Sequence, residues 1–137
     1  MREKNVDFSE LVGKKIISVE RERYHGDYDY AGYLAEEIIF GISDGSEYKM
    51  FHEQDCCESV TVKEVDNDLQ KLVGATVLVA ECVKNDQQKA DDGDTFTWTF
   101  YKLVTDRADY FTISWMGESN GYYSESVDFV LVEEIGQ

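Results

Sequence analysis

The chain has 137 residues, of which 42% are hydrophobic and 13% aromatic, so it can bury the core of one domain and is not disordered. Its formal net charge of −16 argues against direct binding of nucleic acid, because phosphates need lysine and arginine. No apolar run approaches the roughly 18 residues of a membrane span, and the N-terminus lacks the apolar segment of a signal peptide. We therefore expect a cytoplasmic protein with no membrane partner.

The chain contains an internal duplication. Residues 8–20 (FSELVGKKIISVE) align without a gap with residues 69–81 (LQKLVGATVLVAE). Two further blocks follow in the same order in both halves, and the last block begins each time with Glu-Ser-Val. We therefore expect a single domain over residues 1–137, built from two repeats that span residues 8–66 and 69–134.

Each repeat is predicted to contain one short helix and four strands. The strands are indicated by runs of β-branched residues that follow a glycine, by alternation of threonine and aromatic residues, and by the turn signal Asp44-Gly45. The helices should begin at N-caps, Asp7 or Ser9 in one and Asn67 or Asp68 in the other, and should end at Gly13 and Gly74. In the first repeat the helix falls within 7–13 and the strands within 14–24, 35–43, 47–52 and 59–65. In the second repeat the helix falls within 66–74 and the strands within 75–83, 95–105, 110–115 and 126–134.

This order of elements predicts a mainly β fold with a minor helical part. About eight antiparallel strands and two short helices should form a sandwich or a closed barrel with pseudo-two-fold symmetry. The apolar residues expected in the interface between the two halves are Ile16, Ile38, Phe40, Met50, Val77, Trp98, Phe100 and Ile113.

The repeats differ in the loop between their first two strands. In the first repeat this loop carries Tyr24, Tyr28 and Tyr30, whereas its counterpart over residues 84–94 is polar. Tyrosine offers a large contact area with a polar tip, which suits recognition. The alternative is a hairpin whose tyrosines cover the edge of the sheet.

Residues 51–60 (FHEQDCCESV) group His52, Asp55, Cys56 and Cys57. Adjacent cysteines in an extended segment point to opposite faces, so His52, Cys56 and Cys57 are weak candidates for metal ligands. Acidic neighbours would raise the pKa of a nucleophilic thiol, and we expect a reducing environment. The favoured interpretation is structural, with Asp55 and its neighbours capping backbone groups of a tight connection.

The corresponding stretch of the second repeat spans residues 115–126 (WMGESNGYYSES) and has no histidine or cysteine. Both stretches join a third strand to a fourth, so they should lie at the same end of a pseudo-symmetric fold and could form one cleft. The residues predicted to bind a partner or ligand are Tyr24, Tyr28, Tyr30, His52, Asp55, Glu118, Asn120, Tyr122 and Tyr123. We predict no catalytic residue and no cofactor.

The motifs QDCCE (residues 54–58) and GESNGYY (residues 117–123) resemble those of a family of small proteins encoded by bacteriophages and prophages. The resemblance runs from about Leu11 to Val130. It implies an accessory protein in the cytoplasm of a host cell, and it implies no activity for any residue. Small acidic phage proteins often inhibit host machinery, CRISPR systems included.

Three functions follow as hypotheses, and we favour the first. The first is a non-enzymatic inhibitor of a host or defence protein that mimics nucleic acid, which requires carboxylates gathered on one face. The second is a protein that sequesters a nucleotide signal, with Arg21, Arg23 or Lys49 near the phosphate in a deep pocket. The third is a metal-binding protein centred on His52. The oligomeric state does not follow from the sequence.

Overall fold

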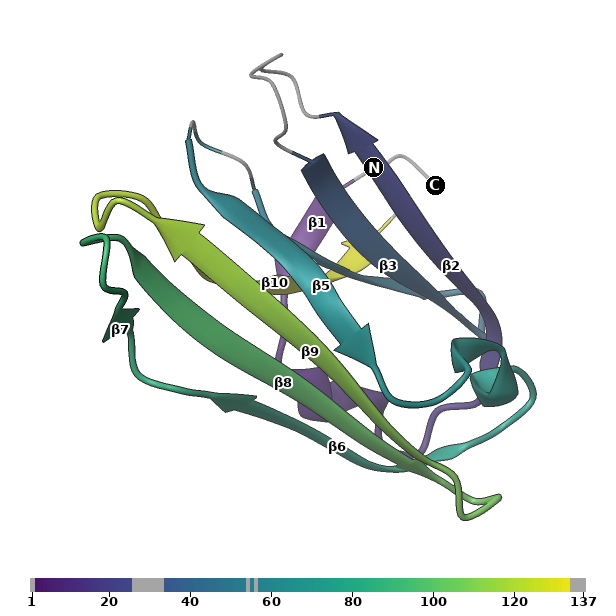
Figure 1. Cartoon of the computed structure of the whole chain (residues 1–137). Coiled ribbons are helices and arrows are strands. Elements are labelled where there is room, and N and C mark those ends of the chain that lie inside the picture. The colour runs from purple at the N-terminus through teal and green to yellow at the C-terminus, as the bar shows by residue number, and fades with distance from the viewer. Residues whose placement is uncertain (1, 26–33, 54, 56, 134–137) are drawn as a thin grey trace.

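The computed structural model describes residues 2–25, 34–53, 55 and 57–133, apart from the side chains of residues 24, 25 and 34. Within these residues, ten strands form two antiparallel sheets (Figure 1). The elements are β1 (Arg2–Asn5), η1 (Phe8–Leu11), β2 (Ile16–His25), β3 (Leu34–Ile42), β4 (Glu47–Phe51), β5 (Ser59–Val65), η2 (Leu69–Leu72), β6 (Val77–Lys84), β7 (Gln88–Lys89), β8 (Thr95–Thr105), β9 (Tyr110–Ser119) and β10 (Asp128–Glu133). The first sheet has the order β1-β10-β4-β3-β2, and the second has the order β5-β9-β8-β6 with β7 beside β8.

The predicted mainly β, antiparallel fold is confirmed, and each of the predicted strands coincides with an observed one. The short strands β1 and β7 were not predicted. The two expected helices are single 3-10 turns, in which the carboxylates of Asp7 and Asp68 accept the N–H groups of Ser9 and Gln70. The closed-barrel alternative is wrong, because the described strands form two open sheets, one with edge strands β1 and β2 and the other with edge strands β5 and β6. No helix in the described part of the chain has the length and apolarity to cross a membrane.

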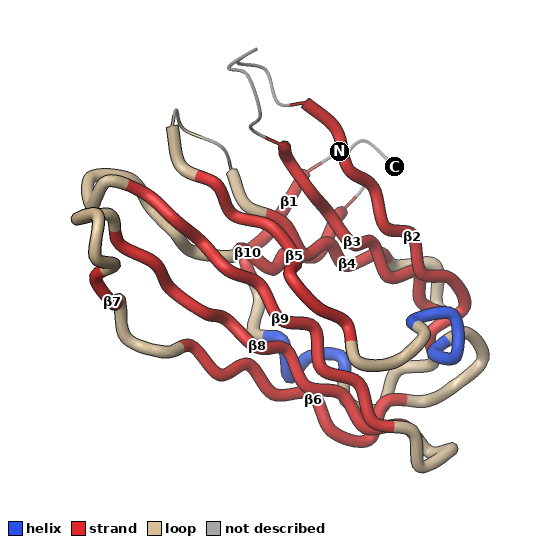
Figure 2. The backbone as a smooth tube through the Cα atoms, viewed as in Figure 1, coloured by secondary structure: helices blue, strands red, loops and turns tan. Residues whose placement is uncertain are grey.

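The fourth strand of each predicted repeat leaves the sheet of its own repeat (Figure 2). Strands β2, β3 and β4 are neighbours in the first sheet, whereas β5 pairs with β9 in the second. Strands β6, β8 and β9 are neighbours in the second sheet, whereas β10 pairs with β4 in the first. Each sheet therefore contains strands from both halves of the sequence, so the two halves share one core.

Equivalent backbone hydrogen bonds join the two halves where their first strands begin. The N–H of Gly13 donates to the carbonyl of Val77, and the N–H of Gly74 donates to the carbonyl of Ile16, both at 2.7 Å. Both glycines have positive φ, 85° and 88°, a conformation that glycine adopts readily. These paired contacts support the division into two repeats, which stays a prediction.

The core lies between the two sheets. Of the apolar residues expected there, six are buried: Ile16, Ile38, Phe40, Met50, Val77 and Ile113. The expectation is wrong for Trp98 and Phe100, which lie on the outward face of β8, whereas Thr97, Thr99 and Tyr101 are buried. Threonine and aromatic residues do alternate along β8. The threonines share one face of the strand with Tyr101 and Leu103, and this face, not the one with Trp98 and Phe100, packs against the core.

The two exchanged strands differ in what covers their outer edge. At β10, the N–H of Val6, just after β1, donates to the carbonyl of Phe129 at 3.2 Å. At β5, the N–H of Val62 donates at 2.8 Å to a carboxylate oxygen of Glu36, which is buried on β3. At β10 a further strand, β1, thus extends the first sheet. At β5 the carboxylate of Glu36, from the first sheet, accepts an edge N–H of the second sheet.

Candidate functional site

The two connections that the sequence predicts to be equivalent lie side by side. We call residues 52–58 and 120–127 the paired loops. Nδ1 of His52 lies 2.7 Å from the carbonyl oxygen of Ser126. A carbonyl oxygen only accepts hydrogen bonds, so Nδ1 carries the proton and donates it. One hydrogen bond therefore ties the first paired loop to the second.

The other ring nitrogen of His52 contacts a fully buried carboxylate. Nε2 of His52 lies 3.0 Å from Oε2 of Glu58, which also accepts the N–H of Asp55 at 3.0 Å. Because Nδ1 is already protonated, this contact requires one further proton between Nε2 and Oε2. The pair is then either imidazolium with carboxylate or imidazole with carboxylic acid, and its net charge is zero in both forms.

This arrangement leaves no ring nitrogen of His52 for a metal ion. Cys57 is disulfide-bonded, contrary to the expectation of reduced thiols, and Cys56 lies outside the described residues. Cys82 is a free thiol on β6, and partial burial raises its pKa, which disfavours the thiolate. Among the described residues no group of three or more His, Cys, Asp and Glu side chains is arranged to hold a metal ion.

Glu125 is the counterpart of Glu58 in the second paired loop, and it is also buried. Its carboxylate accepts hydrogen bonds from Thr95 at 2.5 Å, Ser119 at 2.6 Å, Thr97 at 2.7 Å and Gln87 at 3.2 Å. Burial acts to raise the pKa of Glu125, but these hydrogen bonds outweigh it and leave the pKa below its usual range. The shared Glu-Ser-Val motif thus supplies one buried carboxylate to each loop, a role that the sequence did not reveal.

Among the described residues, the predicted binding residues line separate cavities and not one common cleft. His52 and Asp55 line a cavity of about 390 Å³ between the paired loops. Glu118 and Asn120 line another of about 250 Å³, and Tyr123 lines a third of about 370 Å³. Tyr122 is 89% exposed. The remaining predicted residues, Tyr28, Tyr30 and the side chain of Tyr24, lie outside the described residues.

In the first paired loop the carboxylate of Glu58 accepts the N–H of Asp55, whereas capping by the side chain of Asp55 stays a prediction. The second paired loop has similar capping contacts. Side-chain oxygens of Asn120 and Ser124 accept the N–H groups of Tyr122 and Ser126 at 3.1 and 3.2 Å. Glu118, however, belongs to β9 and not to the loop, because β9 continues to Ser119.

The cations proposed to hold a phosphate all have carboxylate partners. Nε of Arg21 and Nε of Arg23 donate to the same oxygen of Glu36, at 2.7 and 2.9 Å. Nζ of Lys49 lies 2.5 Å from Glu3 and 3.9 Å from Glu37. These partners neutralise the charge that a nucleotide phosphate would require.

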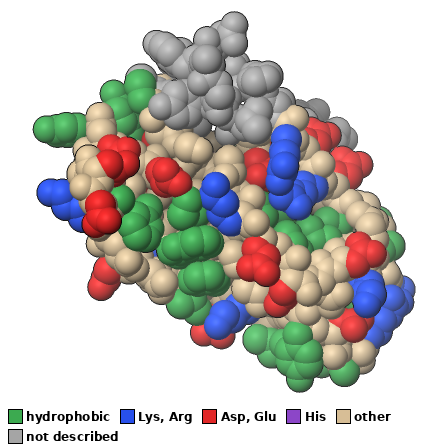
Figure 3. Space-filling view, in the orientation of Figure 1, with side chains coloured by type: hydrophobic (Ala, Val, Ile, Leu, Met, Phe, Trp, Pro, Cys, Tyr) green, Lys and Arg blue, Asp and Glu red, His purple; other side chains and the backbone are tan. Residues whose placement is uncertain are grey.

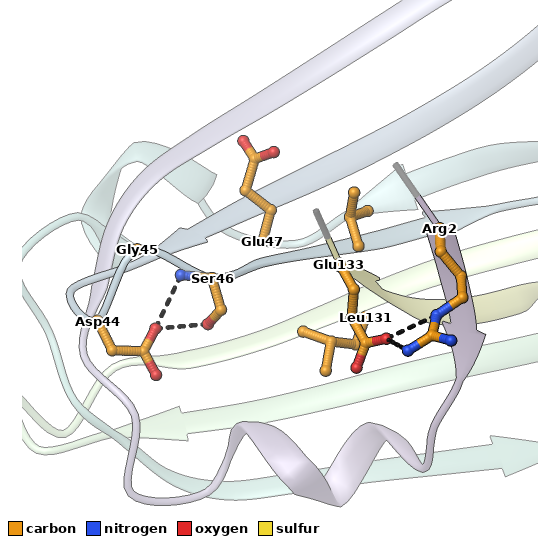
Figure 4. Close-up of a pocket in the computed structure, with 8 residues that line it drawn as sticks. Arg2, Asp44, Gly45, Ser46, Glu47, Leu131 and Glu133 are labelled. Carbon is orange, nitrogen blue, oxygen red and sulfur yellow. Dashed lines mark hydrogen bonds and ion pairs between the residues drawn. The ribbon is translucent and has the colours of Figure 1, made fainter. Parts of the chain in front are cut away.

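A cavity of about 550 Å³ lies between the β3–β4 turn and the end of β10 (Figure 4). On one side of it Arg2 binds Glu133, its direct neighbour in the β1–β10 ladder, with an Nε to Oε2 distance of 2.9 Å (Figure 4). Asp44 turns toward Ser46, accepting its N–H at 2.9 Å. With Glu47 also on its wall, this cavity carries more carboxylates than cations, so it does not suit a phosphate.

The outward face of the first sheet is rich in carboxylates. Glu22 lies directly opposite Glu37 in the β2–β3 ladder, and Lys49 bridges Glu3 and Glu37. The strand register places further acidic residues on the same side, because side chains alternate along each strand. We call this set the acidic face: Glu3, Glu20, Glu22, Glu37, Glu47 and Asp128. Lys49 is the one basic side chain on it among the described strand residues.

Burial and the charged neighbours of Glu37 on the acidic face shift the pKa of this carboxyl. Partial burial raises the pKa of Glu37, Lys49 lowers it, and the nearby Glu22 and Glu3 raise it further. The result is a pKa above the usual range. Like charges directly opposite each other in a ladder are destabilising, so the fold maintains the Glu22–Glu37 pair at a cost.

A model of a family described as a domain of unknown function (DUF7448) matches residues 9–129. The chain belongs to this family. No curated protein and no solved structure matches it. The DUF7448 match includes both paired loops and most of the acidic face, and its description assigns no activity to them.

The outward face of the second sheet in this DUF7448 chain is different in character. Phe96, Trp98 and Phe100 on β8 and Met116 on β9 form a partly exposed row that we call the aromatic strip. The rings of Trp98 and Phe100 are stacked with centroids 5.8 Å apart. On this side of the molecule hydrophobic side chains gather near the middle, and acidic and basic side chains are interspersed around them (Figure 3). Carboxylates are therefore concentrated on the first sheet and not on the second.

Proposed function

We propose that the protein is a non-enzymatic inhibitor that binds a host or defence protein through the acidic face. The target class is a protein with a basic groove for nucleic acid, as in CRISPR effectors, and the acidic face occupies that groove. The proposal rests on the six carboxylates of the acidic face, which gather on one side of the first sheet. Lys49 is the one basic side chain among them in the described strands.

The geometry of a sheet suits this role. Neighbouring strands lie about 4.8 Å apart and alternate residues about 6.8 Å apart, so carboxylates on one face form a regular two-dimensional array. The array is rigid because hydrogen-bonded ladders hold its strands. A rigid array of negative charge can match the lysines and arginines that normally contact the phosphates of a duplex.

The electrostatic cost at Glu37 also supports a binding role. Glu22 lies directly opposite Glu37, so the free protein holds two repelling carboxylates together. The pKa of Glu37 is raised chiefly by partial burial, and Glu22 and Glu3 add to this rise. A basic partner would relieve this repulsion, which adds to the affinity. The resemblance of the two loop motifs to phage-encoded proteins supports the choice of a host or defence protein as the target.

The test compares two triple variants that change the net charge equally. The acidic-face variant is Glu20→Gln/Glu22→Gln/Glu37→Gln. The control variant is Glu53→Gln/Glu64→Gln/Asp91→Asn, and each of its residues is exposed outside the acidic face. Each protein is immobilised and exposed to lysate of a CRISPR-bearing or phage-infected bacterium, and bound proteins are eluted with duplex DNA and identified by mass spectrometry.

We expect the wild type and the control variant to retain nucleic-acid-binding proteins that duplex DNA displaces, and the acidic-face variant to lose them. Equal loss from both variants would show that only the net charge matters. Retention by the acidic-face variant would place the binding surface elsewhere. Either result would contradict the proposal.

A further inference from the structure

We propose that the aromatic strip is a self-association surface, on which a second copy of the chain packs face to face. This inference does not depend on the proposed function, because it concerns the opposite face of the molecule. It begins with the orientation of β8, where Thr97 and Thr99 are buried and the aromatic side chains between and beside them face outward.

Together with Val83 of β6, the aromatic strip forms one continuous apolar surface across three strands. Trp98 lies opposite Met116 of β9, and Phe100 lies opposite Val83 of β6. All of these side chains, with Phe96, are partly exposed. In Figure 3 the hydrophobic side chains near the middle of this side form the surface of the molecule. A contiguous exposed apolar patch on a central strand indicates an interaction surface.

Electrostatics favours a second copy over the alternative pairings of the chain with itself. The acidic face cannot meet its own copy without bringing carboxylates together. The face that carries the aromatic strip meets its copy through apolar side chains, and the two acidic faces then point away from each other. Two sheets packed face to face lie about 10 Å apart, which leaves room for facing aromatic side chains to interdigitate.

The charges at the two ends of the strip are complementary under a two-fold rotation. Lys102 follows Phe100 on β8 and is exposed at one end. Glu118 lies opposite Phe96 and is exposed at the other end. An axis in the interface and perpendicular to the strands exchanges the ends, so Lys102 of each copy approaches Glu118 of the other. The interface is then isologous, with two equivalent ion pairs around a stacked aromatic centre.

The association should respond to salt in a characteristic way. Each copy carries a net charge of −16, and the copies repel each other at low ionic strength. Because the contact itself is mainly apolar, screening this repulsion strengthens the dimer. Binding through the acidic face would weaken under the same change, so salt separates the two surfaces.

Analytical ultracentrifugation of the full chain tests the proposal. We expect twice the 15.8 kDa chain mass to appear as the concentration rises to about 100 µM, at a lower concentration in 0.5 M than in 0.1 M NaCl. Trp98→Thr/Phe100→Thr should weaken association about tenfold or more, because it removes the central ring contacts but keeps residues that favour strands. Ile17→Thr, an exposed change on β2 of the other sheet, should leave association unchanged.

Charge reversal identifies the second copy as the occupant. Lys102→Glu and Glu118→Lys should each weaken the dimer, and the double variant Lys102→Glu/Glu118→Lys should restore it. Thermal unfolding of each variant shows that it remains folded. A wild-type chain that stays monomeric at 100 µM in both salt concentrations would overturn the proposal, and so would a folded double variant that fails to recover.

Discussion

The outward faces of the two sheets occupy equivalent places in the fold but carry opposite chemistry. The first sheet presents the acidic face, and the second presents the aromatic strip. The interior does not differ in this way, because each half contributes one buried glutamate, Glu58 or Glu125, to a paired loop. The buried glutamates are alike in the two loops, whereas the outward residues differ between the two sheets, and we propose that each sheet uses them for a separate contact.

Substitution of the two tryptophans should give the largest difference in the free energy of unfolding between a core residue and a surface residue. Trp115 is fully buried and its Nε1 donates to Sδ of Met50 at 3.0 Å, whereas Trp98 belongs to the aromatic strip. We expect Trp115→Ala to lower the free energy of unfolding by about 4 kcal/mol, because it leaves a cavity in the core. Trp98→Ala should lower it by only about 1 kcal/mol.

Urea denaturation followed by circular dichroism measures both changes, at protein concentrations low enough to keep the chain monomeric. Similar losses for Trp115→Ala and Trp98→Ala would mean that the strip belongs to the folding core and is not a surface.

Substitution of Glu125 tests the framework of the second paired loop. Glu125→Ala leaves the hydroxyls of Thr95, Thr97 and Ser119 without their acceptor, so we expect a loss of about 3 kcal/mol. The pKa of Glu125 is lower in the folded state, so its contribution is present above the unfolded pKa near 4.5 and is lost as the pH falls through the folded pKa.

Glu125→Gln should therefore flatten the acid side of the stability profile between pH 5 and 2, measured by thermal unfolding. An acid transition that is unchanged in this variant would show that other carboxylates dominate it.

The sequence predicts the positions of the strands well, because β-branched runs and turns are local signals. It does not predict that β5 and β10 exchange sheets, since strand pairing depends on contacts distant in sequence. Periodicity also reveals that β8 has two chemically distinct faces but not which one is buried, and Trp98 and Phe100 show the consequence. The Glu-Ser-Val motif marks Glu58 and Glu125 as shared, but their burial depends on partners such as His52 and Thr97.

Neutralisation of Glu37 should give the smallest change in the free energy of unfolding. The informative result is whether the variant is more or less stable than the wild type. The pKa of Glu37 is raised in the folded state, so its contribution to stability is present below the unfolded pKa and is lost as the pH rises through the folded pKa. Glu37→Gln should therefore stabilise the protein at pH 7, by about 0.5 kcal/mol after screening by solvent. Glu53→Gln, an exposed change in the first paired loop, should have no effect.

Differential scanning calorimetry at pH 7 and at pH 4 compares these two variants. A gain for Glu37→Gln at pH 7 that shrinks at pH 4 supports a repulsive acidic face. A loss at pH 7 would show that Glu37 stabilises the first sheet and that its position needs no partner to explain it.

The central claim is that the acidic face contacts the partner, and carboxyl footprinting tests it most directly. Carbodiimide coupling of glycine ethyl ester labels exposed carboxylates in the free protein and in its complex with the identified partner, mixed in solution without DNA, and mass spectrometry locates the labels. We expect Glu20, Glu22 and Glu47 to lose labelling in the complex, whereas Glu53 and Asp91, which are exposed outside the acidic face, keep theirs. Protection of Glu53 and Asp91 with continued labelling of the acidic face would contradict the account.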